Sequence, residues 1–214
     1  MVGRTKRHPV FARVYAVLER AMADSEAPYR EEVAGKASGR VLEIGAGTGG
    51  NLEHYPPGAT VVAVEPDPTM LKGLRKRTSD EPARVLPVRA SAEALPFKDG
   101  VFDAAVASLV LCTVPRPDRA AAEIRRTLRP GATLRFYEHV RSGEDHRLAR
   151  WQDRLERPWG FFAGGCHPNR DTVRMLLEAG FVVRWRSFTM PNAWLAGPHV
   201  VGEATPAAEP SPPA

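Results

Sequence analysis

Glycines crowd into one short stretch of the sequence, directly after an apolar run. In EIGAGTGG, glycine occupies positions 45, 47, 49 and 50, and the acid Glu43 stands two residues ahead of the first glycine. Glycine lets a backbone turn tightly between a strand and a helix, and it lets a ligand approach without a Cβ in the way. The next apolar run ends at a second acid, Glu65, which lies 20 residues beyond Gly45. A carboxylate at that place can accept hydrogen bonds from ribose hydroxyls, so the pattern predicts a ligand that carries a ribose.

Two classes of ligand fit these residues. Gly45, Gly47 and Gly50 satisfy GxGxxG, the fingerprint of a dinucleotide site. Gly49 supports a second spacing, GxGxG, and Pro66 directly after the ribose acid can offer a flat apolar contact to an adenine face. Further along the chain, the turn AEALPF is followed by an apolar strand that begins with Phe-Asp. That combination is not part of a dinucleotide fingerprint, so it favours the second class.

Strand and helix patterns alternate through most of the chain. Apolar runs bounded by turn residues predict buried strands at residues 40–45, 60–66, 83–90, 101–112 and 132–140. Helical spacing predicts helices at residues 8–24, 68–78, 117–131 and 169–180, a short helix after the glycines, and a helical or irregular stretch at 146–159. The last two strands, 181–190 and 198–205, have only a loop between them and should pair antiparallel. We therefore expect an α/β fold: a doubly wound, mainly parallel seven-stranded sheet with an antiparallel C-terminal strand pair and ligands at the carboxyl ends of its strands.

The bulk composition indicates an ordinary globular domain. The chain has 214 residues, is 43% hydrophobic and carries a net charge of +5, but its basic residues are scattered rather than clustered with aromatics, so we expect no nucleic-acid partner. No apolar run approaches the roughly 20 residues of a membrane span. The basic N-terminus has no apolar signal-peptide region behind it, so we expect a cytoplasmic protein. Cys112 and Cys166 lie far apart and outside any metal spacing, which predicts two reduced thiols and no metal site unless scattered residues converge in space.

At these motifs the chain resembles the class I S-adenosylmethionine-dependent methyltransferases of the small-molecule type, which include the ubiquinone/menaquinone C-methyltransferases. The resemblance covers residues 40–204. Five stretches are more closely similar to the eukaryotic methyltransferase-like group whose members methylate alkyl thiols: YPPGATVVAVEPDP, SLVLCTV, TLRPGATLRFYEHV, GGCHPNRDT and PHVVGEA. The place after the fourth strand lacks the Asn/Asp-Pro-Pro-aromatic turn of enzymes that methylate adenine amines and the Pro-Cys pair of cytosine-C5 enzymes.

The resemblance implies a set of cofactor contacts. The stretch EIGAGTGG, residues 43–50, which we call the glycine loop, would wrap the methionine end of S-adenosylmethionine. Glu43 would orient this loop, and Glu65 would hold the ribose. The implied cofactor-binding residues are Glu43, Gly45, Ala46, Gly47, Gly49, Glu65, Pro66, Ser91, Ala92, Glu93, Ser108 and Leu109. Ser91, Ala92 and Glu93 would edge the adenine. Many relatives have Asp where Ser91 stands, and a neutral hydroxyl should bind the exocyclic amine less strongly than a carboxylate does.

Methyl transfer requires alignment of the acceptor and exclusion of water, and a general base only where the acceptor arrives protonated. A thiol is already partly ionised at neutral pH. His139, at the end of the fifth strand, is the candidate catalytic base, against the alternative of a hydrogen-bonded structural histidine. Structural roles are favoured for the other candidates near the cleft, namely Glu138, Cys112, Cys166 and His199. His167 lies in a Gly-rich loop before a helix, which we expect to act as a lid.

The acceptor itself is not fixed by the sequence. Five aromatic side chains, Trp151, Trp159, Phe161, Phe162 and Trp194, either roof an apolar acceptor pocket or cover the sheet edge. The leading function is methyl transfer to a small, hydrophobic acceptor, with a thiol first. An O- or C-methyltransferase of a quinone, lipid or secondary metabolite is the alternative within the enzyme class. An NAD(P)-binding oxidoreductase and a non-catalytic cofactor-binding protein are the alternatives from other classes.

Three segments follow from this interpretation. Residues 1–39 are expected to form a helical cap over the cofactor site, in which Tyr15 either packs in the core or closes over the methionine carboxylate. Residues 40–204 form the methyltransferase domain, and residues 205–214, PAAEPSPPA with the preceding threonine, a disordered tail.

Overall fold

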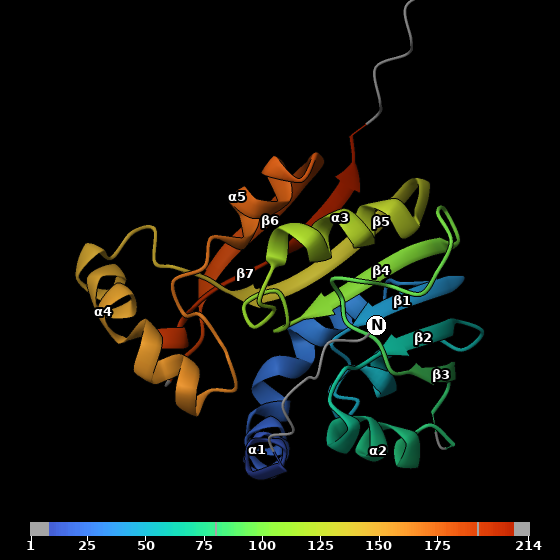
Figure 1. Ribbon diagram of the computed structural model, residues 1–214, viewed down its shortest axis with the longest axis horizontal. Coiled ribbons are helices and arrows are strands. Elements are labelled where there is room, and N and C mark those ends of the chain that lie inside the picture. The colour runs from blue at the N-terminus through green and yellow to red at the C-terminus, as the bar shows by residue number, and fades with distance from the viewer. Residues whose placement is uncertain (1–8, 80, 192, 208–214) are drawn as a thin grey trace, which may run out of the picture.

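The computed structural model describes residues 9–79, 81–191 and 193–207, with side chains from Met22 onward. A single sheet of seven strands, in the order β3-β2-β1-β4-β5-β7-β6, carries helices on both faces (Figure 1). The strands are β1 (Arg40–Ile44), β2 (Thr60–Val64), β3 (Arg84–Val88), β4 (Phe102–Ser108), β5 (Leu128–His139), β6 (Phe181–Thr189) and β7 (Pro198–Pro206). The helices are α1 (Pro9–Ala34), α2 (Pro68–Arg77), α3 (Pro117–Thr127), α4 (His146–Phe162) and α5 (Thr172–Glu178), with 3-10 turns η1 (Leu52–His54) and η2 (Trp194–Ala196).

The topology confirms the predicted fold class. Strands β1 to β5 pair in parallel, while β7 pairs antiparallel with both β5 and β6. The chain runs outward from β1 through β2 to β3 and then returns to place β4 on the other side of β1. In such sheets ligands bind where the order reverses, beyond the carboxyl ends of the strands. The carboxyl ends of β1 and β4 therefore bound the expected site.

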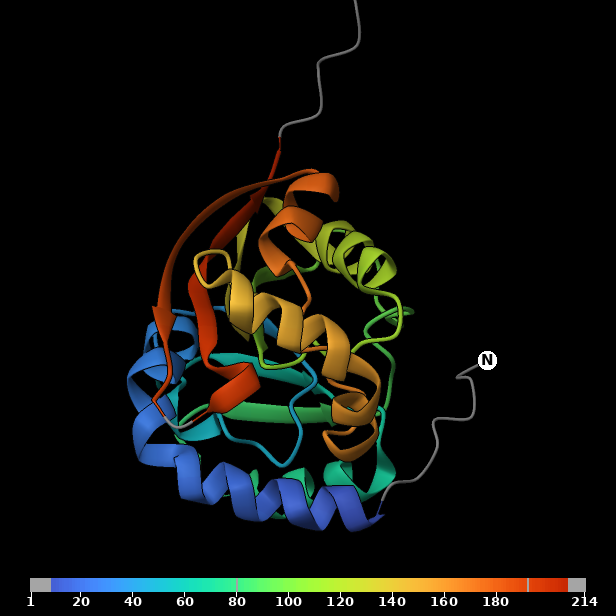
Figure 2. The same ribbon diagram turned by 90° about the vertical axis from the view of Figure 1, so that its left-hand side faces the viewer.

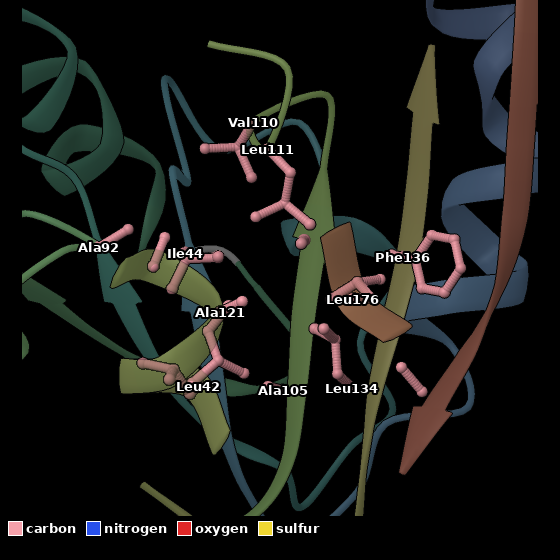
Figure 3. Packing of buried hydrophobic residues seen from close by; sticks show 14 of the residues in the cluster. Leu42, Ile44, Ala92, Ala105, Val110, Leu111, Ala121, Leu134, Phe136 and Leu176 are labelled. Carbon is pink, nitrogen blue, oxygen red and sulfur yellow. The ribbon is translucent and has the colours of Figure 1, made fainter. Parts of the chain in front are cut away.

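Apolar layers on the two faces hold the helices to the sheet. On one face, side chains of α3 and α5 pack on Leu42, Ile44, Leu134 and Phe136 of the sheet, and Figure 3 shows this cluster from close by. On the other face, α1, α2 and η1 pack on a second buried cluster that includes Tyr137. Helix α4 lies across the end of the sheet at which β4 and β5 finish (Figures 1 and 2). No helix in the described part of the chain is both long and apolar enough to cross a membrane.

Aspartates fix where several helices begin. The Asp67 carboxylate accepts the backbone N–H groups of Thr69 and Met70 at the start of α2. Asp145 caps α4 and Asp171 caps α5 in the same manner. Such caps satisfy N–H groups that have no partner inside the helix and contribute about 1 kcal/mol each.

The structure corrects several predicted boundaries. After the glycines the chain forms turns and the single 3-10 turn η1 instead of a short α-helix, because Pro56 and Pro57 follow too closely for one. Strand β4 ends at Ser108, since Leu109 has a φ of 54° that no strand residue adopts. Helix α3 ends at Thr127, and β5 begins at Leu128 with a bulge in its pairing to β4.

The terminal segments also differ in extent from their predictions. Helix α1 continues ten residues beyond the predicted end at residue 24, to Ala34, and its last turns are anchored by the buried Val33 and Ala34. Strand β7 extends to Pro206, into the segment predicted as a tail, because Phe181 and Val182 of β6 pair with Pro206 and Thr205. The remainder of the predicted tail, from residue 208, and the side chain of Tyr15 lie outside the described residues.

Candidate active site

Glu65 lies just after the carboxyl end of β2 and forms a hydrogen bond with the backbone of the glycine loop. Gly47 donates its backbone N–H to Oε2 of Glu65 at 3.0 Å, and Asp67 donates its N–H to Oε1 at 2.7 Å. The side chain is buried, and burial raises its pKa to about 7, although the two N–H groups oppose that shift. An ionised carboxylate has lone pairs beyond the two in use. Glu65 can therefore accept hydroxyl donors from a ligand while it keeps the loop in place.

Left-handed backbone conformations explain the glycines more directly than ligand access does. Gly45, Gly47 and Gly49 have φ values of 62°, 58° and 98°. A Cβ on Gly45 would lie 2.1 Å from Cγ2 of Val110, in the loop that follows β4. Glycine is thus required at position 45 because the loop after β4 packs directly against it.

A buried polar network joins the glycine loop to β1 and β4. Nδ2 of Asn51 donates to Oε1 of Glu43 at 2.9 Å and to Oγ of Ser108 at 3.1 Å. On its other side, Oδ1 of Asn51 accepts Nη1 of Arg30 at 2.8 Å, and Arg30 is ion-paired with Glu26 of the same helix. The orienting role of Glu43 stays a prediction, and this network contains the hydrogen bond through which it would act. Sequence reasoning missed Asn51 and Arg30, since neither belongs to a motif.

The predicted adenine edge lies beyond β3. Ser91 is half-buried and its Oγ accepts the backbone N–H of Glu93 at 3.3 Å, while Ala92 is buried. Oε1 of Glu93 accepts the backbone N–H of Arg116 at 2.9 Å, ahead of α3. Glu65 itself donates its backbone N–H to the carbonyl of Val88 at the end of β3. The residues predicted to hold the ribose and to lie along the adenine edge therefore follow adjacent strands, β2 and β3.

Glu138 clamps the loop that follows β4. Its Oε1 accepts the N–H groups of Val110 and Leu111 at 2.9 and 2.8 Å, and its Oε2 accepts that of Cys112 at 3.2 Å. Burial raises its pKa against these three donors. Just before the clamp, Leu109 takes its left-handed φ and donates its N–H to the carbonyl of Tyr137. Glu138 thus holds the backbone beside the expected methyl-transfer position.

His139 meets both cysteines at the end of β5. Its Nε2 lies 2.9 Å from Sγ of Cys166, to which Trp159 also donates its ring N–H at 3.0 Å. The ligand atoms of Cys112, His139 and Cys166 all lie within 4.8 Å of one another, and all three side chains are buried. Hydrogen bonds from Cys112 and His139 lower the pKa of Cys166 to about 4. The hydrogen bond between the two cysteines and burial raise the pKa of Cys112. Two cysteines that are far apart in the sequence are therefore neighbours in the fold.

The contact with Cys166 bears on the base predicted at His139. Nε2 is occupied by the sulfur, and Nδ1 is buried and has no hydrogen-bond partner within the described residues. His167 is paired with Glu156, and His199 donates its Nδ1–H to the carbonyl of Gly197. Burial lowers the pKa of His199 to about 4, which keeps that ring neutral.

The aromatic side chains divide into two groups. Trp159 packs edge-on to Trp194 at 6.3 Å between ring centroids and donates its ring N–H to Sγ of Cys166. Phe161 and Phe162, at the end of α4, are 82% and 79% exposed, so they line no closed pocket in this conformation. Sequence reasoning missed an aromatic stack on the other face, in which Tyr137 and His199 are buried and Tyr29 and Phe188 partly buried.

Comparisons with known proteins agree with this geometry. Residues 42–136 match the family model described as a methyltransferase domain. The chain is 36% identical to the human thiol S-methyltransferase TMT1B over 175 residues, which cover 78% of the chain and 72% of that protein. It is 35% identical to the rat TMT1B over 172 residues, 77% of the chain and 69% of the relative. A solved SAM-dependent methyltransferase from Thermotoga maritima has 26% identity and a TM-score of 0.66, covering 92% of this chain and 97% of that one.

Proposed function

Because the chain belongs to the class I S-adenosylmethionine-dependent methyltransferases, we propose that it methylates the sulfur of a small-molecule thiol. One observation carries the choice of a thiol: 36% identity to a thiol S-methyltransferase over 78% of the chain. The cofactor, S-adenosylmethionine, supplies a methyl group on a positively charged sulfur when it is bound.

We propose cofactor contacts for the residues predicted from the sequence. Glu65 would accept the ribose hydroxyls, in support of which it is buried at the end of β2 with spare lone pairs. The glycine loop would hold the methionine end, and Ser108 and Leu109 would lie beside the sulfonium. The polar network of Glu43, Asn51 and Ser108 supports this arrangement, because it fixes the loop to the end of β4.

The demands of thiol methylation match what the chain offers. A thiol is partly ionised near neutral pH, so alignment and exclusion of water matter more than a strong base. We propose that the acceptor lies near the ends of β4 and β5, where Glu138 fixes the loop and His139 is the candidate catalytic residue. The acceptor is proposed to be hydrophobic, in keeping with the aromatic side chains Trp159 and Trp194 nearby.

A product assay tests this proposal. Purified protein would be mixed with S-adenosylmethionine and a panel of thiols, phenols, quinols and amines, and S-adenosylhomocysteine would be measured. We expect turnover with alkyl thiols and much less with the matched alcohols. Turnover of phenols or quinols with silence from every thiol would favour the O- or C-methyltransferase instead. Cofactor binding without turnover would favour a non-catalytic protein, and binding of NAD(P) alone an oxidoreductase.

Cellular context stays part of the proposal. We propose a cytoplasmic enzyme that acts on small molecules without a nucleic-acid partner, and fractionation of the native host would test its location.

A further inference from the structure

Three parts of the chain converge at the cysteine–histidine cluster, which we define as Cys112, His139 and Cys166. Cys112 lies in the loop after β4, His139 ends β5, and Cys166 lies in the loop after α4. Within the described residues, this is the one group of three or more His, Cys, Asp or Glu side chains placed to hold a metal ion, and all three are buried. Thiolate sulfur and imidazole nitrogen are the ligand atoms that zinc prefers.

We propose that this cluster binds a zinc ion, and that the open fourth position of the zinc takes the sulfur of the acceptor thiol. The second half of the proposal rests on the proposed function. Three protein ligands with one open position are typical of catalytic zinc sites, whereas structural sites close all four positions.

The spacing of the ligand atoms suits zinc after a small adjustment. A tetrahedral zinc, with Zn–S of about 2.3 Å and Zn–N of about 2.0 Å, sets its ligand atoms about 3.5–3.8 Å apart. The atoms of the cluster lie within 4.8 Å, and the 2.9 Å contact between His139 and Cys166 would have to widen. Cys166 follows Gly164 and Gly165, both at positive φ, in a loop of small residues that can accommodate such a shift.

Neighbouring groups support bound thiolates. Trp159 donates its ring N–H to Sγ of Cys166, and such N–H···S bonds orient metal-bound sulfur. Arg170 is half-buried beside both cysteines and donates Nη1 to the carbonyls of Leu111 and Val114. A zinc ion with two cysteine thiolates and a neutral histidine has no net charge. An added acceptor thiolate would bring one negative charge, and the Arg170 guanidinium would stabilise it.

Within the described residues, no fourth His, Cys, Asp or Glu side chain offers a ligand atom within 4.8 Å of all three members of the cluster. The two oxygens of Glu138, next to His139 in sequence, accept three backbone N–H groups, and His199 donates Nδ1–H to the carbonyl of Gly197. The fourth position is therefore left for an exogenous ligand. Ser108, four residues before Cys112, bonds to Asn51 of the glycine loop, so the cluster lies on the segment that joins the cofactor side to the acceptor side.

Methylation of a zinc-bound acceptor would take two steps, coordination of the thiol and transfer of the methyl group. Coordination breaks the acceptor S–H bond, forms a Zn–S bond and releases the proton to bulk water. The zinc-bound sulfur then forms a bond to the methyl carbon, while the carbon–sulfur bond of the sulfonium breaks and leaves its electron pair on the departing sulfur. The product is a neutral thioether, a poorer zinc ligand than a thiolate, so it leaves the metal.

Metal titration tests the site without any assay of activity. The full chain, kept reduced with a phosphine, would be titrated with Co²⁺, which reports thiolate ligation and tetrahedral geometry by its absorption bands, and Zn²⁺ would then displace it. We expect one metal ion per chain. Cys112→Ser, Cys166→Ser and His139→Asn should each weaken binding at least tenfold. His146 is an exposed histidine on α4, and His146→Asn should leave binding unchanged. Binding of S-adenosylhomocysteine by each variant checks that it is folded.

The absorption of wild-type protein decides the metal site even where a variant fails to fold. Absence of thiolate-to-cobalt bands in the wild type would overturn the site. Addition of 1-propanethiol should change the visible bands, whereas 1-propanol should leave them as they are. A cobalt spectrum that ignores propanethiol would overturn the acceptor half of the proposal.

The same measurements separate this proposal from the proposed function. Thiol methylation by a chain that binds no metal would refute the zinc site and leave the thiol methyltransferase standing. A cobalt spectrum that responds to propanethiol, combined with no methylation of any thiol, would support the metal site and refute the proposed function.

Discussion

Among single side chains, Glu65 links pH to cofactor binding. Its pKa of about 7 results mainly from burial, so the carboxylate is protonated in a large fraction of the cofactor-free protein at neutral pH. Ribose hydroxyls donate to the ionised form, so binding favours loss of the proton. The affinity for S-adenosylhomocysteine should therefore rise with pH up to about 7 and level off above it. Between pH 8 and pH 6 we expect a loss of about tenfold, one decade for each pH unit below the pKa.

Glu65→Gln provides the control, since glutamine keeps a carbonyl oxygen but does not titrate. The variant should bind more weakly than wild type at pH 8, and its affinity should vary little between pH 6 and pH 8 in calorimetric titrations. An equally steep pH dependence in wild type and variant would show that Glu65 does not contact the ribose.

The stability of the cofactor-free protein should show the opposite pH trend. Because the folded pKa is raised from 4.5 to about 7, burial of the charge destabilises the fold as pH rises through that window. Thermal unfolding should thus show Glu65→Gln to be the more stable protein above pH 7, with the gap closing below pH 4.5.

The elements are held in place by polar side chains that bridge them. Asn51 joins α1, β1 and β4 through Arg30, Glu43 and Ser108, and Glu138 joins β5 to the loop after β4. These groups are buried, so each hydrogen bond to a charged partner matters more than a surface contact does. The glycine loop is therefore positioned by its polar partners as well as by its backbone conformation.

Asn51→Ala tests that bridge. The substitution removes one hydrogen bond from Arg30 and one from Glu43, because both side chains bond to Asn51. We expect it to lower the free energy of unfolding by about 1.5–3 kcal/mol. Its affinity for S-adenosylhomocysteine should fall as well, because the loop loses its tie to β4. Urea unfolding and calorimetry measure the two effects, with Asn169→Ala as the control, since Asn169 bonds to the exposed carboxylates of Asp153 and Glu156. Unchanged cofactor affinity would show that the loop holds its shape without the network.

How far the sequence predicts the site depends on how local each signal is. The glycines and Glu65 form one strand–loop–strand pattern, and the spacing alone indicates a ribose-bearing ligand. Asn51 forms hydrogen bonds across the fold but belongs to no motif, so nothing in the sequence marks it. The cysteine–histidine cluster joins residues 27 and more positions apart, as with His139 and Cys166. Only the sheet order and the path of α4 bring them together, which explains why sequence spacing did not group these three residues.

For the molecule as a whole, the same sheet forms the hydrophobic core and carries the candidate site residues at the ends of its strands. Leu134 of β5 is fully buried, its register partners are Ala105 of β4 and Ala204 of β7, and it packs in the layer shown in Figure 3. Leu134→Ala should therefore lower the free energy of unfolding by about 2–5 kcal/mol through lost burial and the cavity that remains. In a chain of this length each kcal/mol lowers the melting temperature by about 2–4 °C. Leu177→Ala, on the exposed side of α5, should change stability by less than about 0.5 kcal/mol.

Saturation with S-adenosylhomocysteine extends the test of Leu134 to the active site. A ligand that binds only the folded state stabilises it by an amount set by its concentration and dissociation constant. Leu134 lies in the core and forms no part of the proposed cofactor contacts, so its variant should keep the wild-type dissociation constant. The ligand should then raise the unfolding free energy of wild type and variant equally. A smaller gain in the variant would mean that packing in the middle of β5 sets the geometry of Glu138 and His139 at its end, and that core and site are energetically coupled.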